Sequence, residues 1–173
     1  MATATQPVHM SLDLYLKSSF EPDAEFVDGV IEERPVGEYD HSSWQHAIEL
    51  WFALHAQKWA VRARPELRVQ VSRSRFRVPD VTILDRNRPI EQIITHPPIA
   101  VFEVLSPEDS INKMMTKLAD YERMGIKTIL VLDPNGRHFR YIAGSLEPLS
   151  PKPFDLPGSS CRFDLAEIEK LLD

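Results

Sequence analysis

The stretch Ile99-Ala-Val-Phe-Glu-Val-Leu-Ser-Pro107 is almost entirely apolar, yet it carries one acid, Glu103, near its centre. A short apolar run of this kind is typical of a central strand that is covered on both faces of its sheet. A carboxylate inside such a strand costs several kcal/mol unless it is paired or binds a metal. The stretch therefore predicts a buried sheet that contains an acid with a structural or chemical partner.

A second acid occupies the same kind of position upstream. Asp80 lies in a run with apolar neighbours, and we expect a strand over residues 78–84. Neighbouring strands lie about 4.8 Å apart, so facing carboxylates could share one divalent cation. Carboxylates, a backbone carbonyl and water make an oxygen site that suits Mg²⁺ or Mn²⁺. The alternative is that each acid belongs to a structural ion pair.

Patterns on both sides of these strands indicate an α/β fold with a mixed sheet. The Asp28-Gly29 pair is a strong signal for an N-terminal hairpin over residues 25–33. Apolar residues recur at helical spacing over 41–59, where Asp40 or Ser42 could cap the helix, and over 111–124, where Gly125 ends it. Further strands are expected over 67–71, 127–132 and 137–142.

We expect residues 1–10 to form a flexible tail and residues 11–173 to form a single domain. Within it, 143–173 is expected to be a loop followed by a short C-terminal helix that Asp164 caps. The chain has 173 residues, one cysteine and no apolar stretch near the roughly 20 residues of a membrane span. The N-terminus does not resemble a secretory signal, so a cytoplasmic protein without membrane association is expected.

The net charge of −6 argues against a general nucleic-acid coat protein, but the charge is uneven. Seven bases and one acid lie between Lys58 and Arg77, and a local basic strip can bind phosphates. The alternative is a solvated edge strand and loop. Lys117 lies on the flank of the 111–124 helix, where its side chain could reach the sheet edge and stabilise developing negative charge. A solvated surface lysine is the alternative there.

Several motifs together resemble a known family. These are Arg77-Val-Pro-Asp80, Phe102-Glu-Val-Leu-Ser-Pro107, Lys117-Leu with Tyr121 and Gly125, and Leu132-Asp-Pro134. They look like the PD-(D/E)XK nuclease superfamily. Within it the chain is similar to the bacterial "putative restriction endonucleases" of the Uma type, a domain of unknown function, and the resemblance spans roughly residues 11–142.

The resemblance implies a restriction-endonuclease-like core in the order αβββαβ and a metal site formed by Asp80 and Glu103. The superfamily's usual lysine would fall at position 105, which is Leu105 here, and Lys117 matches the position from which relatives supply it. An acid is common four residues before that lysine, where this chain has Lys113. Glu25 and His41 fit auxiliary positions near the site. The alternatives are a surface residue of the hairpin for Glu25 and a capping or packing residue at the start of the helix for His41.

These patterns lead us to expect a metal-dependent endonuclease that hydrolyses DNA, with Mg²⁺ or Mn²⁺ as cofactor and Asp80, Glu103 and Lys117 as catalytic residues. A homodimer would be needed to cut both strands at once. The expected contacts to the DNA backbone are Arg68, Arg73, Arg75, Arg77 and Lys113. Two alternatives remain open: an inactive nuclease-like fold that binds DNA or protein, and a structural domain whose acids are buried ion pairs.

Overall fold

A six-stranded mixed sheet forms the centre of the computed structural model, which describes residues 6–172. Strand β8 runs parallel to β9, and the other neighbours in this sheet are antiparallel. In spatial order the strands are β11 (Ser145–Pro148), β10 (His138–Ile142), β9 (Ile129–Leu132), β8 (Ala100–Val104), β7 (Val81–Asp85) and β4 (Val61–Pro65).

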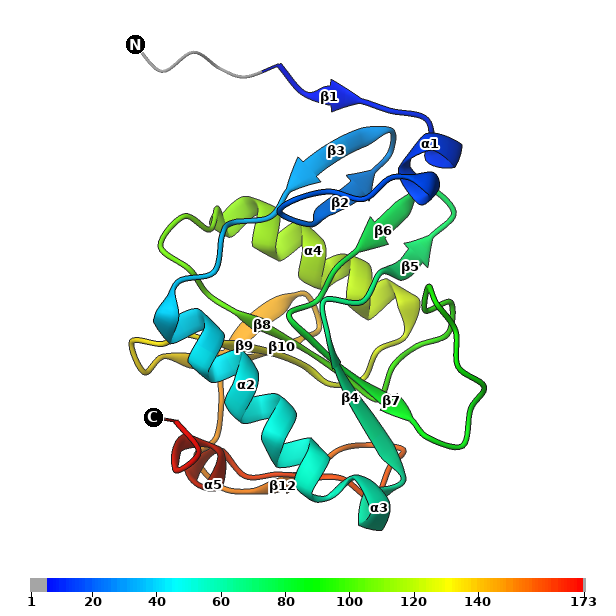
Figure 1. Cartoon of the computed structure of the whole chain (residues 1–173). Helices are drawn as coiled ribbons and strands as arrows, with labels where there is room; N and C mark the ends of the chain where they lie inside the picture. The colour runs from blue at the N-terminus through cyan, green and yellow to red at the C-terminus, as the bar shows by residue number, and fades with distance from the viewer. Residues whose placement is uncertain (1–5, 173) are drawn as a thin grey trace.

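A smaller antiparallel sheet contains the N-terminal strands of the chain (Figure 1). Its strands are, in spatial order, β1 (Val8–His9), β3 (Val30–Glu33), β2 (Ala24–Val27), β6 (Arg75–Arg77) and β5 (Val69–Ser72). Strands β2 and β3 form the expected hairpin, because Asp28 and Gly29 adopt φ angles of 50° and 90°, the left-handed values that this tight turn requires. A third sheet pairs β12 (Phe154–Asp155) with β13 (Arg162–Phe163).

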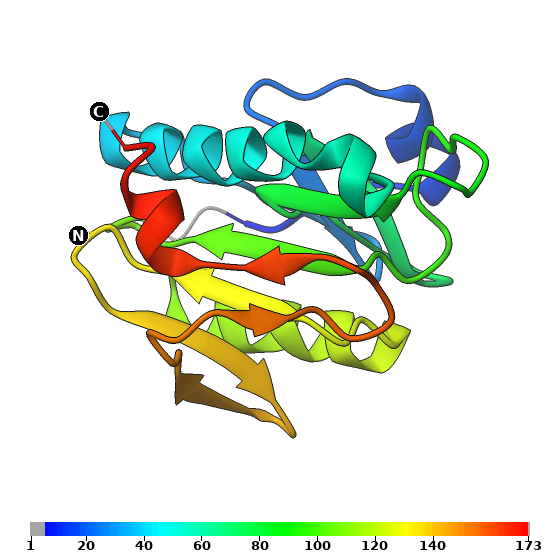
Figure 2. The same ribbon diagram turned by 90° about the horizontal axis from the view of Figure 1, so that it is seen from below.

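Helices cover both faces of the six-stranded sheet (Figure 2). The helices are α1 (Leu12–Lys17), α2 (Tyr39–Leu54), α3 (Ala56–Trp59), α4 (Ile111–Met124) and α5 (Leu165–Glu169). Trp44, Ile48 and Phe52 of α2 pack on one face together with α5. On the opposite face, Met114, Leu118 and Tyr121 of α4 pack against alternate residues of β8 and β9. This two-sided cover explains why β8 is apolar at nearly every position.

The α/β class and the order αβββαβ are confirmed. The elements α2, β4, β7, β8, α4 and β9 occur in this order along the chain, although not all of them are consecutive. The first strand of that order was predicted wrongly. The strand expected over 67–71 is β5 of the small sheet, whereas β4 pairs with β7 in the large sheet. Strand β4 alternates Val61 and Ala63 with arginines because it has only one face against the core.

Several predicted ends of elements are confirmed and others are corrected. Gly125 ends α4 with a φ of 97°, and the Asp164 side chain accepts a hydrogen bond from the Glu167 amide at the start of α5. The predicted helix over 41–59 instead begins at Tyr39 and is divided into α2 and α3. Its N-cap is Glu38, so Asp40 lies in the first turn, where a negative charge is favourable.

The predicted tail and the predicted C-terminal loop contain more regular structure than expected. Val8–His9 pair with β3, while residues 1–5 of the tail lie outside the described residues. Strands β11, β12 and β13 occupy parts of 143–172, and α5 ends at Glu169. Across residues 6–172, no helix has the length and apolar character needed to cross a membrane.

Candidate active site

Strand pairing brings Asp80 and Glu103 together. In the antiparallel pair β7–β8, Val81 faces Phe102. Asp80, which precedes Val81, therefore faces Glu103, which follows Phe102. Asp80 Oδ2 also accepts a hydrogen bond of 2.7 Å from the backbone amide of Val104. Both acids are buried, and Glu103 lies on the face of β8 that α4 covers. The expected neighbourhood of the two carboxylates therefore exists.

Lys117 of α4 lies against the same face of the sheet. Its Nζ atom is 2.8 Å from Glu103 Oε2 and 2.8 Å from Glu25 Oε1, and it donates a hydrogen bond of 3.1 Å to the carbonyl oxygen of Val78. Because both distances are measured from the same Nζ atom, Glu103 Oε2 and Glu25 Oε1 lie no more than twice 2.8 Å apart. The flank position that the helical wheel predicted directs this lysine inward rather than into solvent.

Glu25 comes from β2, so the cluster joins the two sheets. Its Oε1 accepts a hydrogen bond of 2.9 Å from the Val78 amide, and its Oε2 lies 2.9 Å from Arg77 Nη1. Glu25 is only 4% exposed, which makes the hairpin surface residue of the alternative reading untenable. An acid expected to be auxiliary is thus a buried partner of Lys117.

Two basic residues surround Asp80. The guanidinium of Arg34 forms an ion pair with Asp80 Oδ1, and its Nη1 lies 3.3 Å from Glu66 Oε1. His41, at the start of α2, places Nε2 3.3 Å from Asp80 Oδ2, as its predicted auxiliary position allows. Sequence reasoning missed Arg34. It lies between β3 and α2, where no periodicity marks a residue as inward-facing.

Tyr121 and Gln45 complete the set of hydrogen bonds. The Tyr121 hydroxyl donates to Glu103 Oε1 at 2.7 Å, and Gln45 Nε2 donates to the Asp80 carbonyl oxygen at 3.1 Å. Tyr121 lies one helical turn after Lys117, so one face of α4 supplies both donors to Glu103. That i, i+4 spacing was visible in the sequence, where Tyr121 belongs to the motif with Lys117, but no role in the site was predicted for it.

Burial and mutual repulsion set the protonation of the acids. Burial, with the charges of Asp80 and Glu25, raises the pKa of Glu103 to about 7 despite the opposing effect of Lys117. Burial also acts to raise the pKa of Asp80, but His41 and Arg34 outweigh it and lower that pKa. The pKa of Glu25 is lowered as well, because Lys117 and Arg77 outweigh its burial. The site therefore combines one acid whose pKa is raised with two acids whose pKa values are lowered.

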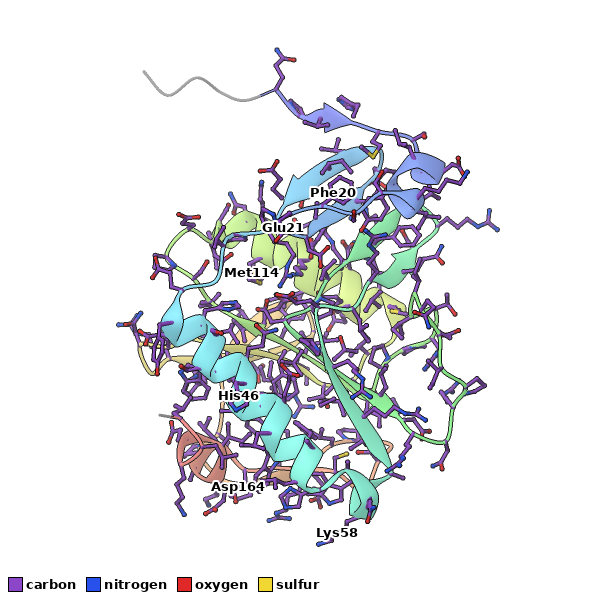
Figure 3. All side chains as sticks on the ribbon, viewed as in Figure 1. Phe20, Glu21, His46, Lys58, Met114 and Asp164 are labelled. Atoms are coloured by element: carbon purple, nitrogen blue, oxygen red, sulfur yellow. The ribbon has the colours of Figure 1, made fainter. Side chains whose placement is uncertain are left out.

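These side chains line a cleft of about 180 Å³. Glu25, Asp80, Glu103 and Lys117 form part of its wall, and further lining comes from residues 32–37 and from the segment that leads into α4. Figure 3 marks Met114, another lining residue, on α4. In Figure 1 the N-terminal ends of α2 and α4 lie on the same side of the molecule. A reacting group can thus approach the buried acids from that side.

The predicted DNA-binding residues are divided by the fold. Arg77 is 1% exposed and binds Asp120, Glu25 and Glu32. Arg75 binds Asp28 and Asp120, and Arg68 donates to the Ser18 carbonyl oxygen and lies over the Tyr15 ring. Arg73 and Lys113 are exposed, and Lys113 lines the cleft. The structure therefore places two of the five predicted contacts where a phosphate could reach them freely.

The donor atoms allow a test of the implied metal. Among the described residues, no group of three or more His, Cys, Asp or Glu side chains is arranged to hold an ion. Two carboxylates and the Val104 carbonyl nevertheless match the oxygen ligands that Mg²⁺ and Mn²⁺ prefer. Burial and the neighbouring carboxylates of Asp80 and Glu25 raise the pKa of Glu103, so they disfavour a negative charge that a bound cation would stabilise. The residues therefore fit a cation held by two carboxylates.

Leu105 occupies the position of the superfamily's usual lysine. It packs, partly buried, in the apolar cluster beneath α4. The ammonium group next to Glu103 comes instead from Lys117, fourteen positions along the chain. The departure in sequence is thus matched by a lysine at the same acid in space.

Comparisons with known proteins concern the fold and the family of the chain. A putative nuclease from Anabaena variabilis ATCC 29413, solved by crystallography, superposes with a TM-score of 0.79 at 22% identity, covering 95% of this chain and 99% of that one. A DrdV–DNA complex matches with a TM-score of 0.43 at 15% identity, over 78% of this chain and 11% of that one. No curated protein matches.

The crystal structure of the Anabaena variabilis protein supports the fold, and the match to a family sequence model establishes the family. The sequence model of a family described as "Uma2: Putative restriction endonuclease" matches residues 12–151. That range holds both strand acids, the hairpin acid Glu25 and the helix lysine Lys117. The chain therefore belongs to the Uma2 family of nuclease-like proteins.

Proposed function

We propose that the protein is a metal-dependent endonuclease that hydrolyses phosphodiester bonds in DNA. The observation that carries this proposal is the position of Lys117, whose ammonium group lies between Glu103 and Glu25 in the wall of the cleft that also contains Asp80. Three acids and one lysine meet there, from β2, β8, α4 and the position just before β7. Buried charges at the wall of a cleft are more typical of a chemical site than of a core.

Asp80, Glu103 and the Val104 carbonyl would hold Mg²⁺ or Mn²⁺, which supplies a water of lowered pKa and a Lewis acid for the phosphate. Lys117 provides a fixed positive charge beside the reacting phosphate and stabilises the negative charge that develops on it. Glu25 keeps that lysine charged, since its carboxylate helps to raise the pKa of Lys117 against the effect of burial. Tyr121 fixes the orientation of Glu103.

Of the five basic residues that the sequence predicts to contact DNA, Lys113 and Arg73 are the proposed contacts to the DNA backbone. Lys113 has the stronger case, because it lines the cleft one turn before Lys117. Arg77 and Arg75 are better assigned to internal ion pairs. A monomer presents one such site and nicks one strand, and a two-fold dimer would bring a second site to the other strand.

A non-catalytic DNA-binding or protein-interaction module is the second candidate. It is favoured by one observation: Asp80 and Glu103 each already have a basic partner within the chain. Thermal melting with Mn²⁺ separates the two candidates, because a ligand that binds the folded state raises the melting temperature by mass action. A set of satisfied ion pairs would leave the melting temperature unchanged.

Cleavage of supercoiled plasmid DNA tests the catalytic proposal directly. The purified chain should convert the plasmid to nicked or linear forms with Mg²⁺ or Mn²⁺ and should not do so in EDTA. Asp80→Asn and Glu103→Gln should abolish conversion while the far-ultraviolet circular dichroism stays that of the parent. A parent protein that leaves supercoiled, linear and single-stranded DNA intact with both metals would establish the non-catalytic candidate.

A further inference from the structure

Arg34 has no place in the roles given above, yet it contacts a proposed metal ligand. Its side chain is 12% exposed and forms an ion pair with Asp80 Oδ1. The residue lies outside any helix or strand, between β3 and α2, and lines the cleft. A buried arginine whose planar group faces a carboxylate is a strong partner, because it forms charge-assisted hydrogen bonds.

The charges around Arg34 show what it compensates. Burial opposes its charge, but Asp80 and Glu103, followed by Glu66, hold its pKa above the ordinary value. Asp80 Oδ2 already accepts hydrogen bonds from the Val104 amide and His41, so Arg34 takes the remaining oxygen. A divalent cation bound at Asp80 would need oxygen lone pairs that these donors occupy. Arg34 and the cation therefore compete for the same carboxylate.

The surroundings also give Arg34 an alternative partner. Its Nη1 lies 3.3 Å from Glu66 Oε1, and the Glu66 side chain is 47% exposed. If Arg34 leaves Asp80, its charge stays paired with the exposed Glu66. The cost of the exchange is therefore lower than that of abandoning an unpaired buried charge.

On the basis of the proposed function, we infer that Arg34 is an internal counter-ion that occupies the cation position at Asp80 until a divalent metal ion displaces it. It is a positioning residue: it keeps Asp80 ionised and in place in the metal-free protein. Metal binding then requires the conformer in which Arg34 has moved away. The apparent dissociation constant is accordingly weakened by the fraction of molecules in that conformer.

Calorimetric titration with Mn²⁺ alone, without DNA, tests this inference. Arg34→Gln should bind Mn²⁺ about tenfold more tightly than the parent, because the competing cation is gone. Arg86→Gln is the matched control. Arg86 is exposed and follows β7 at the end opposite Asp80, roughly 20 Å away along the strand, so Mn²⁺ affinity should stay that of the parent.

Melting temperatures provide a second readout that a purely structural arginine would not produce. Arg34→Gln should melt below the parent in EDTA, where Asp80 has lost its counter-ion, and should recover most of the difference in saturating Mn²⁺. Weaker Mn²⁺ binding together with an equal loss of melting temperature in both conditions would overturn the inference and leave the nuclease proposal standing. If neither the parent nor Arg34→Gln binds Mn²⁺, both the metal site and the inference fail.

Discussion

Two neighbouring clusters of charge in this protein differ in composition: the inner cluster places one acid, Asp120, between two arginines, whereas three acids line the cleft together with Lys117. In the inner cluster, Arg77 and Arg75 bind Asp120 between the small sheet and α4. In the cleft cluster, Asp80, Glu103 and Lys117 meet in the wall of an open cleft. Glu25 belongs to both, because it contacts Arg77 with one oxygen and Lys117 with the other.

The comparison shows why burial of charge alone does not identify an active site. Arg77 donates to Asp120, Glu25 and Glu32, so its hydrogen-bonding capacity is filled by the protein. In the cleft cluster, burial together with the charges of Asp80 and Glu25 raises the pKa of Glu103 to about 7. A cluster with unbalanced negative charge beside a cleft can bind a further cation, whereas an inner cluster with balanced charge only joins elements of the fold.

The largest effect should come from breaking the inner cluster. Arg77→Met keeps most of the apolar stem but leaves the carboxylates of Asp120 and Glu25 with fewer partners. Removing one side of a buried ion pair costs about 3–5 kcal/mol, and the free energy of unfolding in urea should fall by that amount. Lys17→Met is the control, because the Lys17–Asp13 pair is well exposed and such pairs contribute about 1 kcal/mol or less. Equal losses in the two variants would remove the distinction between inner and surface charge.

Lys117→Met should break the cleft cluster in its chemistry. Cleavage of plasmid DNA with Mn²⁺ should fall by about a hundredfold or more, the usual consequence of losing one charge-stabilising group. Because Lys117 also separates Glu25 from Glu103, some loss of stability accompanies the substitution, and assays belong well below the melting temperature of the variant. Mn²⁺ binding should survive, since the oxygen ligands remain. A variant that cleaves as fast as the parent would exclude Lys117 from the chemistry.

Glu103→Gln should expose the imbalance of the cleft cluster through pH. Burial and the neighbouring acids raise the pKa of Glu103 from 4.5 to about 7, so the folded state holds a proton that the unfolded state releases. Between about pH 4.5 and pH 7 the contribution of this group to stability therefore decreases as the pH rises. The parent in EDTA should lose free energy of unfolding across that window, and Glu103→Gln should lose less. Parallel pH profiles for the two proteins would argue against a strained Glu103.

The cleft cluster was the part of the site that could be predicted from sequence. An acid in an apolar strand has few explanations, so Asp80 and Glu103 stood out, and α4 was predicted with its observed ends, Ile111–Met124. The helix spacing also placed Lys117 on a face that can reach the sheet. Local patterns were sufficient because Glu103 and Lys117 lie in regular elements and Asp80 directly precedes one, β7.

The inner cluster could not be predicted in the same way. The arginines between Lys58 and Arg77 appeared to be one basic strip, but their partners Asp28, Glu25 and Asp120 come from distant parts of the chain. Pairing of this kind depends on tertiary contacts that no periodicity records. Strand β4 was not predicted as a separate element, because its arginines were assigned to the basic strip; the alternative reading of that strip, a solvated edge strand and loop, fits β4 at the edge of the main sheet. Arg34 lies in irregular chain and has no pattern at all.

The smallest expected effect concerns the outer edge of the cleft cluster, where Lys113 lies one turn before Lys117 on α4. Its exposed side chain lines the cleft and can meet a phosphate as a solvated point charge. Lys113→Met should weaken binding to DNA of any sequence by a similar modest factor, and it should reduce the slope of log affinity against log salt by about 1. Fluorescence anisotropy with a labelled duplex at several salt concentrations measures both quantities, with Ca²⁺ in place of Mg²⁺ to prevent cleavage.

The rate of cleavage at saturating enzyme should change far less than in Lys117→Met, because Lys113 holds the backbone and does not contact the acids. An unchanged salt slope would mean that the DNA backbone does not cross this wall of the cleft. A collapse of cleavage equal to that of Lys117→Met would instead move Lys113 from the edge of the cluster into its chemistry.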